Sequence, residues 1–267
     1  MDWKGRVAIV TGASSGIGAT AARRLAREGL RVVLVARREE RLRGVAAQIE
    51  AAGGETLTVA ADLTEEQGRL LLAERVHAAY GPVDVLVNSA GLGWYGFGTQ
   101  MPWSLARQMI QVNMAAVVHL TLLFLPEMKA RDRGHIVNVG SIAGNLPSQG
   151  VALYCATKSF LDAFTTALYR ELRGTCVHVS VVKPGPVSTE FFDTASTAGL
   201  RMPAERFAVK PERVADSIWR LLNRPRRVAF VPDWYRVVPW VEPAFGWIMD
   251  LLGPLLLRRQ LKLLPDL

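Results

Sequence analysis

Cysteine and histidine are scarce in this chain of 267 residues, and their scarcity excludes whole classes of protein. The two cysteines, Cys155 and Cys176, are too few for a disulfide framework. Neither they nor the four histidines show the spacing of metal ligands, so we expect no metal site. The amino-terminal residues lack the apolar segment and cleavage site of a secretion signal. The sequence therefore predicts a cytoplasmic protein in a reducing environment.

Acidic residues are in the minority, with 24 Asp and Glu against 32 Lys and Arg and a net charge of +8. A basic chain can bind nucleic acid or an anionic surface. The basic residues are scattered, however, and no nucleic-acid motif accompanies them, so we expect no nucleic-acid partner. Hydrophobic residues make up 50% of the chain, which is enough for a large core and argues against disorder.

Short apolar segments alternate with longer amphipathic ones along most of the chain. Most of the short segments are continuous runs of apolar residues, as in strands buried on both faces of a sheet. The expected strands are 7–11, 31–36, 56–60, 83–88, 135–139 and 177–182, and the expected helices are 16–28, 39–52, 65–79, 102–129 and 154–172. This alternation predicts a Rossmann-type α/β fold, a doubly wound parallel sheet of about seven strands with helices on both faces.

The alternation breaks at residues 188–210, which are rich in Thr, Ala, Gly and Phe and show no strong period. A long irregular segment after a strand is usually functional, so we expect a substrate lid here. We assign residues 1–232 to one domain that includes this lid. Residues 233–267 form an apolar tail.

A glycine-rich turn joins the first expected strand to the first expected helix. Gly12 permits the tight turn, Gly16 lets the backbone approach a pyrophosphate, and Gly18 lets helix and strand pack closely. The amino terminus of the helix adds N–H groups and a positive dipole end. The residues expected to cradle a dinucleotide here are Gly12, Ser14, Ser15, Gly16, Ile17 and Gly18.

Two arginines, Arg37 and Arg38, follow the second expected strand. An NAD-binding unit places a carboxylate near this position to bind the ribose hydroxyls. A guanidinium instead suits a 2′-phosphate, which it binds with charge-assisted and often bidentate hydrogen bonds. The sequence therefore predicts NADP(H), with Arg37 as the first candidate for the phosphate contact.

Tyr154 and Lys158 are four positions apart in a segment expected to be helical, so both side chains lie on one face. A carbonyl that accepts hydride must also gain a proton, and a phenol with a pKa of about 10 exchanges poorly at neutral pH. An ammonium about 4 Å away contributes roughly 4 kcal/mol at an effective dielectric near 20. That energy lowers the phenol pKa by up to about three units. The pair therefore predicts a general acid and base.

Three further features stand in order around this pair. Asn113 lies in an expected helix, Ser141 follows the strand at 135–139, and Pro184-Gly185 follows the strand at 177–182. With the T-G-x-x-x-G-x-G turn, they resemble the short-chain dehydrogenase/reductase family of the ordinary short type, with its Asn–Ser–Tyr–Lys tetrad. The resemblance spans about residues 5–230.

The resemblance implies a role for each matching residue. Ser141 would bind the substrate oxygen, Lys158 would also hold the nicotinamide ribose, and Asn113 would hold a water that links Lys158 to solvent. An Arg after the second strand would favour NADP(H), often assisted by Ser14. The other implied cofactor contacts are Asp62 and Leu63 near the adenine, Asn88, Ala90 and Gly91 in a turn whose second position is Ser89, and Pro184, Gly185, Val187 and Thr189 near the nicotinamide.

Bulky apolar residues near the expected active site favour a hydrophobic ketone or aldehyde, or the matching alcohol, as substrate. The expected substrate contacts are Ser141, Trp94, Leu146, Phe191 and Phe192. A 3-ketoacyl-carrier-protein reductase would share the fold and the tetrad. A non-catalytic NADP-binding sensor or scaffold is the alternative from another class, because fold does not fix function.

The tail is apolar from residue 234 to 257 and contains three prolines. On a helix, Trp240, Phe245 and Leu251 fall on one face, and Glu242 and Asp250 fall on the other. Two carboxylates and the prolines disfavour a membrane-spanning helix. The sequence leaves open a membrane-surface segment, a subunit contact and a flap over the substrate pocket. The family resemblance implies a homodimer or homotetramer.

Overall fold

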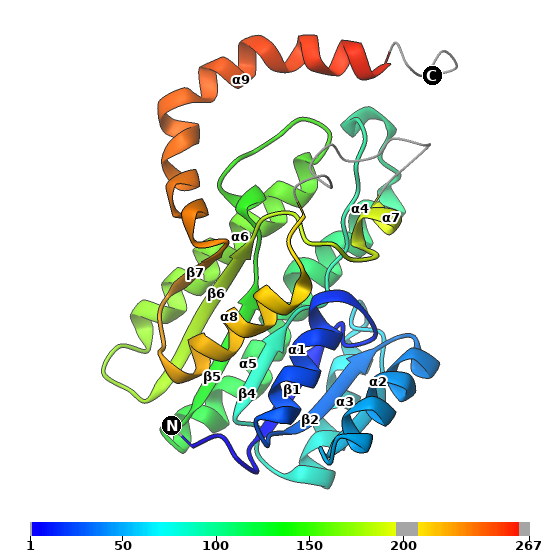
Figure 1. The fold of residues 1–267 in the computed structure, drawn as a ribbon, viewed down its shortest axis with the longest axis vertical. Helices are drawn as coiled ribbons and strands as arrows, with labels where there is room; N and C mark the ends of the chain where they lie inside the picture. Colours follow the sequence, from blue (N-terminus) through cyan, green and yellow to red (C-terminus); the bar gives the residue numbers. More distant parts are fainter. Residues whose placement is uncertain (1, 196–207, 262–267) are drawn as a thin grey trace.

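The computed structural model describes residues 2–195 and 208–261, without the side chains of residues 193, 194, 249 and 252–261. Most of the expected lid, residues 196–207, therefore lies outside the described residues. The remainder forms a central sheet covered by helices on both faces (Figure 1).

Seven parallel strands form the sheet in the order β3-β2-β1-β4-β5-β6-β7. Their bounds are β1 Val7–Thr11, β2 Arg31–Ala36, β3 Thr56–Ala60, β4 Val85–Asn88, β5 Gly134–Val139, β6 Val177–Pro184 and β7 Val228–Val231. The Rossmann-type fold is thus confirmed, and β1, β2 and β3 have the expected bounds. β4 begins two residues later than expected, and β6 runs two residues further, to Pro184. Sequence periodicity did not locate β7, the four-residue edge strand.

Helices cover both faces of the sheet. The bounds are α1 Gly16–Arg27, α2 Glu39–Ala51, α3 Glu66–Tyr80, α4 Trp103–Ile110, α5 Ala116–Ala130, α6 Ala152–Glu171, α7 Phe191–Ala195, α8 Pro211–Asn223 and α9 Val238–Leu261. α1, α2 and α8 share one hydrophobic core, and α3 and α5 share the other. The helix expected at 102–129 consists of α4, a π-helical turn at Gln111–Ala115, and α5.

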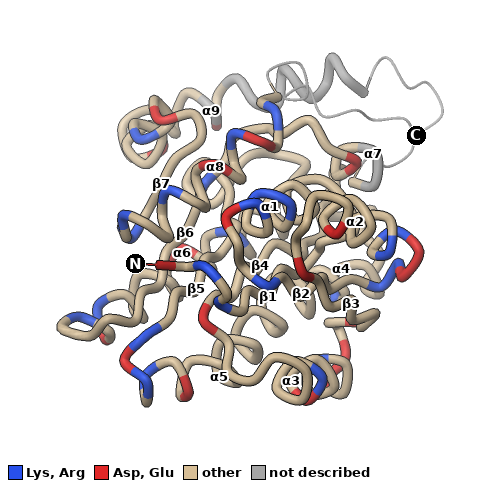
Figure 2. The backbone as a smooth tube through the Cα atoms, turned by 60° about the horizontal axis from the view of Figure 1, so that its bottom comes forward, with Lys and Arg blue, Asp and Glu red and all other residues tan. Residues whose placement is uncertain are grey.

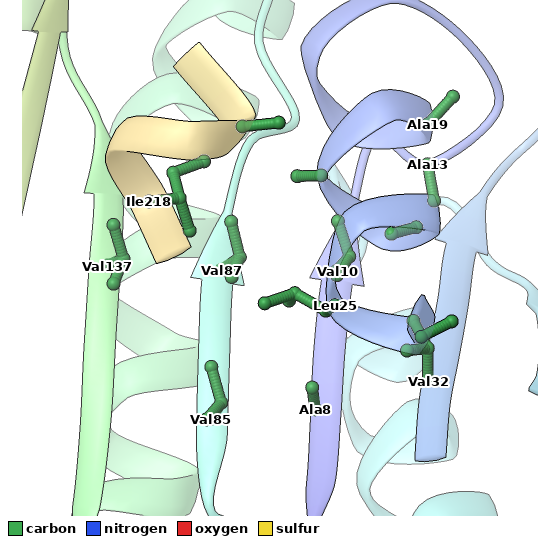
Figure 3. Close-up of a cluster of buried hydrophobic side chains, with 14 of the residues drawn as sticks. Ala8, Val10, Ala13, Ala19, Leu25, Val32, Val85, Val87, Val137 and Ile218 are labelled. Atoms are coloured by element: carbon green, nitrogen blue, oxygen red, sulfur yellow. The ribbon is translucent and has the colours of Figure 1, made fainter. Parts of the chain in front are cut away.

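The strands alternate their side chains between the two cores. Ala8 and Val10 of β1 face the core that they share with Leu25 of α1 and Ile218 of α8 (Figure 3). Val7 and Ile9 of the same strand face the opposite core. Fully burying an aliphatic side chain of this size contributes about 1.5–3 kcal/mol. Both faces of β1 are therefore anchored.

β1 lies between β2 and β4, and this arrangement decides where a ligand can bind. The chain leaves β1 toward β2 on one side, whereas β4 continues the sheet on the other. A crevice opens at the carboxyl ends of the strands where the winding direction changes. The glycine-rich turn after β1 lies at this crevice.

The chain leaves β7 through a short 3-10 helix at Asp233–Val237 and continues into α9. α9 rises from β7 beyond the carboxyl ends of the strands and then turns across the top of the view (Figure 1). Trp234, Trp240 and Trp247 are 61%, 76% and 64% exposed. The tail expected from the sequence is thus largely helical, and aromatic side chains lie on its outer surface.

One helical stretch in the described residues, Trp103–Ala130, is long and apolar enough to span a membrane, with a mean hydropathy of 1.7. It is the α4–α5 unit, and Leu120, Phe124 and Met128 of α5 are fully buried in the core. Packing against the sheet thus accounts for one apolar face of this stretch, whereas Leu122 on another face is 60% exposed. Lys and Arg are spread over the chain rather than gathered on one element (Figure 2).

Candidate active site

A cavity of about 950 Å³ lies at the carboxyl ends of the strands. It joins the turn after β1 to the amino-terminal end of α6. The sequence-predicted residues that line it are Gly12, Ser14, Ser15, Gly16, Ile17, Gly18, Arg37, Arg38, Asp62, Leu63, Ala90, Gly91, Ser141, Leu146, Tyr154, Lys158, Pro184, Gly185, Val187, Thr189, Phe191 and Phe192. Three predicted residues, Asn88, Trp94 and Asn113, are not among the lining residues.

The glycine-rich turn is packed too closely for side chains. A Cβ on Gly12 would lie 2.9 Å from the Cα of Ala90, and a Cβ on Gly18 would collide with the carbonyl oxygen of Gly12. Thr11, which sequence reasoning missed, fixes the neighbouring turn because its Oγ1 accepts hydrogen bonds from the N–H groups of Ser89 and Ala90, both at 3.0 Å. The backbone therefore forms a narrow cradle that a flat, anionic ligand can approach.

The two arginines after β2 differ in their contacts. Arg37 points to Asp62, with 3.8 Å between Nη1 and Oδ2. Arg38 donates to Ser14 Oγ at 3.1 Å and to Ser15 Oγ at 2.9 Å. The guanidinium that lies beside the serines of the turn is therefore that of Arg38, although the sequence pointed first to Arg37. Sequence position alone could not separate them, because adjacent side chains point in different directions.

Tyr154 and Lys158 lie on the first turns of α6, and Ser141 lies at the start of the short helix Ile142–Gly144 after β5. The Lys158 Nζ is 5.6 Å from the centroid of the Tyr154 ring and donates to the carbonyl oxygen of Val139 at 2.9 Å. Burial raises the pKa of Tyr154 to about 12, while its hydrogen bond with Ser141 acts in the opposite direction. The pKa of Tyr154 is therefore raised in this structure, opposite in direction to the lowering by Lys158 that the sequence led us to expect.

Lys158 is one of several buried charged residues next to the cavity. Burial lowers its pKa to about 8, and the carboxylate of Asp162 acts against that shift. Asp162 pairs with Lys183 of β6 at 2.7 Å, and Lys183 donates to Asn145 at 2.7 Å. Sequence reasoning missed Asp162 and Lys183. The available signal was a carboxylate four positions after Lys158, which places both on one helix face.

Asn113 lies in the π-helical turn between α4 and α5, a feature often found at functional sites. Its side-chain amide makes two hydrogen bonds with the backbone of Leu92. Oδ1 accepts from the N–H of Leu92 at 2.8 Å, and Nδ2 donates to the carbonyl oxygen of Leu92 at 2.9 Å. A second bond from Nδ2 reaches Thr157 at 3.0 Å. Asn113 therefore ties the loop after β4 to α6, below the cavity wall.

Asn88 and Trp94 also lie away from the cavity surface. Asn88 donates to Asn138 of β5 at 2.9 Å and so links two strands. The indole of Trp94 lies beside Gly96, and the neighbouring Tyr95 lines the cavity instead. The sequence predicted that Trp94 would line this wall. The direction of the loop places Tyr95 there instead.

The segment after β6 and the tail line the part of the cavity near Tyr154. The ring of Phe191 lies 5.5 Å from that of Tyr154. Glu242 and Asp250 of α9 also line the cavity. These are the two carboxylates that the sequence places on the helix face opposite Trp240.

The chain is similar to known proteins of one family. The model of the short chain dehydrogenase family matches residues 6–198. An oxidoreductase of Staphylococcus epidermidis is 35% identical over 225 residues, covering 84% of this chain and 94% of that protein. A ketoacyl reductase of Nostoc sp. is 34% identical, covering 82% of this chain and 76% of its own length. A glycine betaine reductase of Emericella nidulans is 34% identical over 229 residues, but these make up only 18% of that protein.

Two solved structures share the fold. A metagenomic short-chain oxidoreductase in complex with NADP is 38% identical, with a TM-score of 0.74 and coverage of 86% of this chain and 96% of that one. A short-chain dehydrogenase/reductase from Burkholderia phymatum in complex with NAD is 25% identical, with a TM-score of 0.84 and coverage of 93% and 96%. The chain is therefore an oxidoreductase that belongs to the short-chain dehydrogenase family.

Proposed function

We propose that this oxidoreductase binds NADP(H) and interconverts a hydrophobic ketone or aldehyde and its alcohol. The observation that carries the proposal is that Ser141, Tyr154 and Lys158 line the same cavity as the glycine-rich turn and Arg38. A dinucleotide along the turn would place its nicotinamide end near Tyr154. One cavity thus serves the cofactor and the reacting carbonyl.

Arg38 supports NADP(H) over NAD(H) as the cofactor. It follows β2 and donates to Ser14 and Ser15 of the turn after β1, where a 2′-phosphate would receive charge-assisted hydrogen bonds. β2 ends at Ala36, and Arg37 and Arg38 follow it instead of the carboxylate that holds ribose hydroxyls in NAD-binding relatives of the fold. The NADP complex of the metagenomic relative, which is 38% identical, agrees with this choice.

The bound cofactor would supply or accept the hydride, and side chains of the protein would donate or accept the proton. Tyr154 would donate its phenolic proton to the carbonyl oxygen during reduction and take it back during oxidation. With a pKa of about 12, it keeps that proton at neutral pH, as a general acid must. Ser141 would stabilise the charge that develops on the oxygen. The Lys158 ammonium would lower the cost of the phenolate.

The walls of the cavity support a hydrophobic substrate. Tyr95, Leu146 and Phe192 line the substrate end, and the Phe191 ring faces Tyr154. We infer that α9 forms part of the same wall, as a flap, because Glu242 and Asp250 face the cavity. A 3-ketoacyl-type reductase is the second candidate, favoured by the similarity to the Nostoc ketoacyl reductase.

Replacing Tyr154 by Phe tests the proposal directly. We expect NADPH consumption with a panel of ketones and aldehydes to fall about 10²- to 10⁴-fold, the usual contribution of a general acid. NADPH binding, measured by its fluorescence, should stay nearly unchanged. Tyr169→Phe, on the same helix α6, is the matched control and should keep full activity.

The panel also separates the alternatives. Ketoacyl thioesters as the best substrates would identify the second candidate. NADPH binding without turnover of any compound by the wild-type protein would overturn the enzymatic proposal in favour of a sensor. Undiminished turnover by Tyr154→Phe would overturn the role of Tyr154.

A further inference from the structure

Glu190 lies in the cavity wall directly after Thr189, and its carboxylate meets two arginines. Arg41 of α2 contacts both of its oxygens at 2.6 Å. Arg38 Nη1 lies 3.2 Å from Glu190 Oε2. Glu190 and Arg41 are 149 positions apart along the chain, and no sequence motif includes either of them. An anionic side chain thus lies between two arginines at the cavity wall.

The guanidinium of Arg38 would have to bind both Glu190 and the 2′-phosphate of the cofactor. Arg38 donates to Ser14 and Ser15 through Nη2 and to Glu190 through Nη1. A 2′-phosphate bound beside Ser14 would need the same fork of donors. The Glu190 carboxylate and a 2′-phosphate are both anions, so they repel each other when both lie near Arg38. If Glu190 moves away from the arginines instead, its ion pairs with them are lost.

We propose that Glu190 is a specificity-determining residue that weakens the preference for NADPH over NADH by competing with the 2′-phosphate for Arg38 and Arg41. The inference rests on the proposed binding of NADP(H) in this cavity. NADH carries a hydroxyl instead of the phosphate, so it neither repels Glu190 nor needs its ion pairs broken. Glu190 therefore lowers the affinity for NADPH and not that for NADH.

The exposure of these side chains sets the size of the effect. The side chains of Arg38, Arg41 and Glu190 are 45%, 48% and 48% exposed, so solvent screens their interaction. Exposed ion pairs of this kind change equilibria by about two- to fivefold. Salt weakens them further, because the Debye length falls to about 3 Å at 1 M ionic strength.

Calorimetry with two nucleotides that differ only in the 2′-phosphate tests the proposal without any substrate. Adenosine 2′,5′-bisphosphate and adenosine 5′-monophosphate are titrated into the wild-type protein, Glu190→Gln and Glu39→Gln. Glu39 is the matched control because it pairs with Arg43 on the same helix at 2.6 Å and does not line the cavity. Thermal unfolding of each variant checks that it is folded.

We expect Glu190→Gln to bind the bisphosphate about two- to fivefold more tightly and the monophosphate unchanged. The gain should shrink at high salt, and Glu39→Gln should match the wild-type protein. An unchanged ratio of the two affinities in Glu190→Gln, or weaker binding of the bisphosphate, overturns the inference. A wild-type protein that binds both nucleotides equally, beside a Glu190→Gln protein that discriminates, keeps the inference but overturns the proposed NADP(H) preference of the native chain.

Discussion

The carboxyl ends of the strands and the tail both contribute to the cavity, but they are built differently. The turn after β1 and the residues around Lys158 are held by buried backbone, by Thr11 and by the Asp162–Lys183 pair. The tail instead reaches the cavity with one face of α9, and Trp240 on that helix is 76% exposed. Rigid positions suit chemistry, and peripheral segments suit the choice of substrate.

The largest effect is expected at the glycine-rich turn. In Gly18→Ala, the new Cβ would collide with the backbone oxygen of Gly12, which cannot yield as a side chain can. We expect about 1–3 kcal/mol lower stability in urea unfolding, as for other overpacked sites, and at least a tenfold loss of NADPH affinity.

Gly44→Ala is the matched control for that experiment. Gly44 lies within α2, and a Cβ there would meet nothing within 4 Å. The exchange should raise stability by up to about 1 kcal/mol, because Ala favours helices. Equal stability and NADPH binding in Gly18→Ala and the wild-type protein would show that the turn is not as tightly constrained as we infer.

The next effect is a pH dependence that originates at Lys158. Burial lowers its pKa to about 8, so the ammonium is present below that pH and lost above it. We expect kcat/KM for NADPH to fall as pH rises through about 8, approaching tenfold per pH unit. Tyr154 does not produce this loss, because its pKa is about 12.

Asp162→Asn sharpens the assignment of that titration. The Asp162 carboxylate raises the pKa of Lys158, so its removal should move the inflection to lower pH. Asp162→Glu keeps the charge and serves as the control. An inflection that stays in place in Asp162→Asn would mean that another group controls the profile.

The sequence predicted the strand-end region well because its elements have strong local signals. β1, β2 and β3 are continuous apolar runs, and their bounds agree with the prediction. β7 has only four residues and lies at the edge of the sheet, so periodicity gave too little signal to locate it. The π-helical turn at Asn113 was also missed, because a single wide turn does not alter the apolar pattern of a long helix.

The site residues were predictable where a motif fixed their spacing. The turn, Ser141, Tyr154 and Lys158 line one cavity, as expected from motifs. The choice between Arg37 and Arg38 depended on side-chain direction. The position of Glu190 beside the arginines depended on a contact between segments that are distant in the sequence. No local pattern encodes either. The catalytic roles, the expected homodimer or homotetramer and the membrane contact stay predictions.

The smallest effect is expected in the tail, where two residues of α9 make a matched pair. Glu242 lines the cavity, and among the described residues its Oε2 has no hydrogen-bond partner although it is buried. Trp240 is 76% exposed and does not line the cavity. A carboxylate oxygen without a hydrogen-bond partner disfavours an apolar ligand beside it. Glu242→Gln should therefore lower the KM for hydrophobic ketones severalfold, while NADPH affinity stays unchanged.

Trp240→Ser should leave both constants unchanged and alter stability by less than about 0.5 kcal/mol, as expected for an exposed side chain. Steady-state kinetics with NADPH and the best ketone of the panel gives KM, and nucleotide fluorescence gives the cofactor affinity. If Glu242→Gln changed NADPH affinity rather than KM, the tail would contribute to cofactor binding and the division between the two regions would fail. If KM changed in Trp240→Ser instead, the outer face of α9 would be the one that reaches the substrate, against the orientation of the helix in this structure.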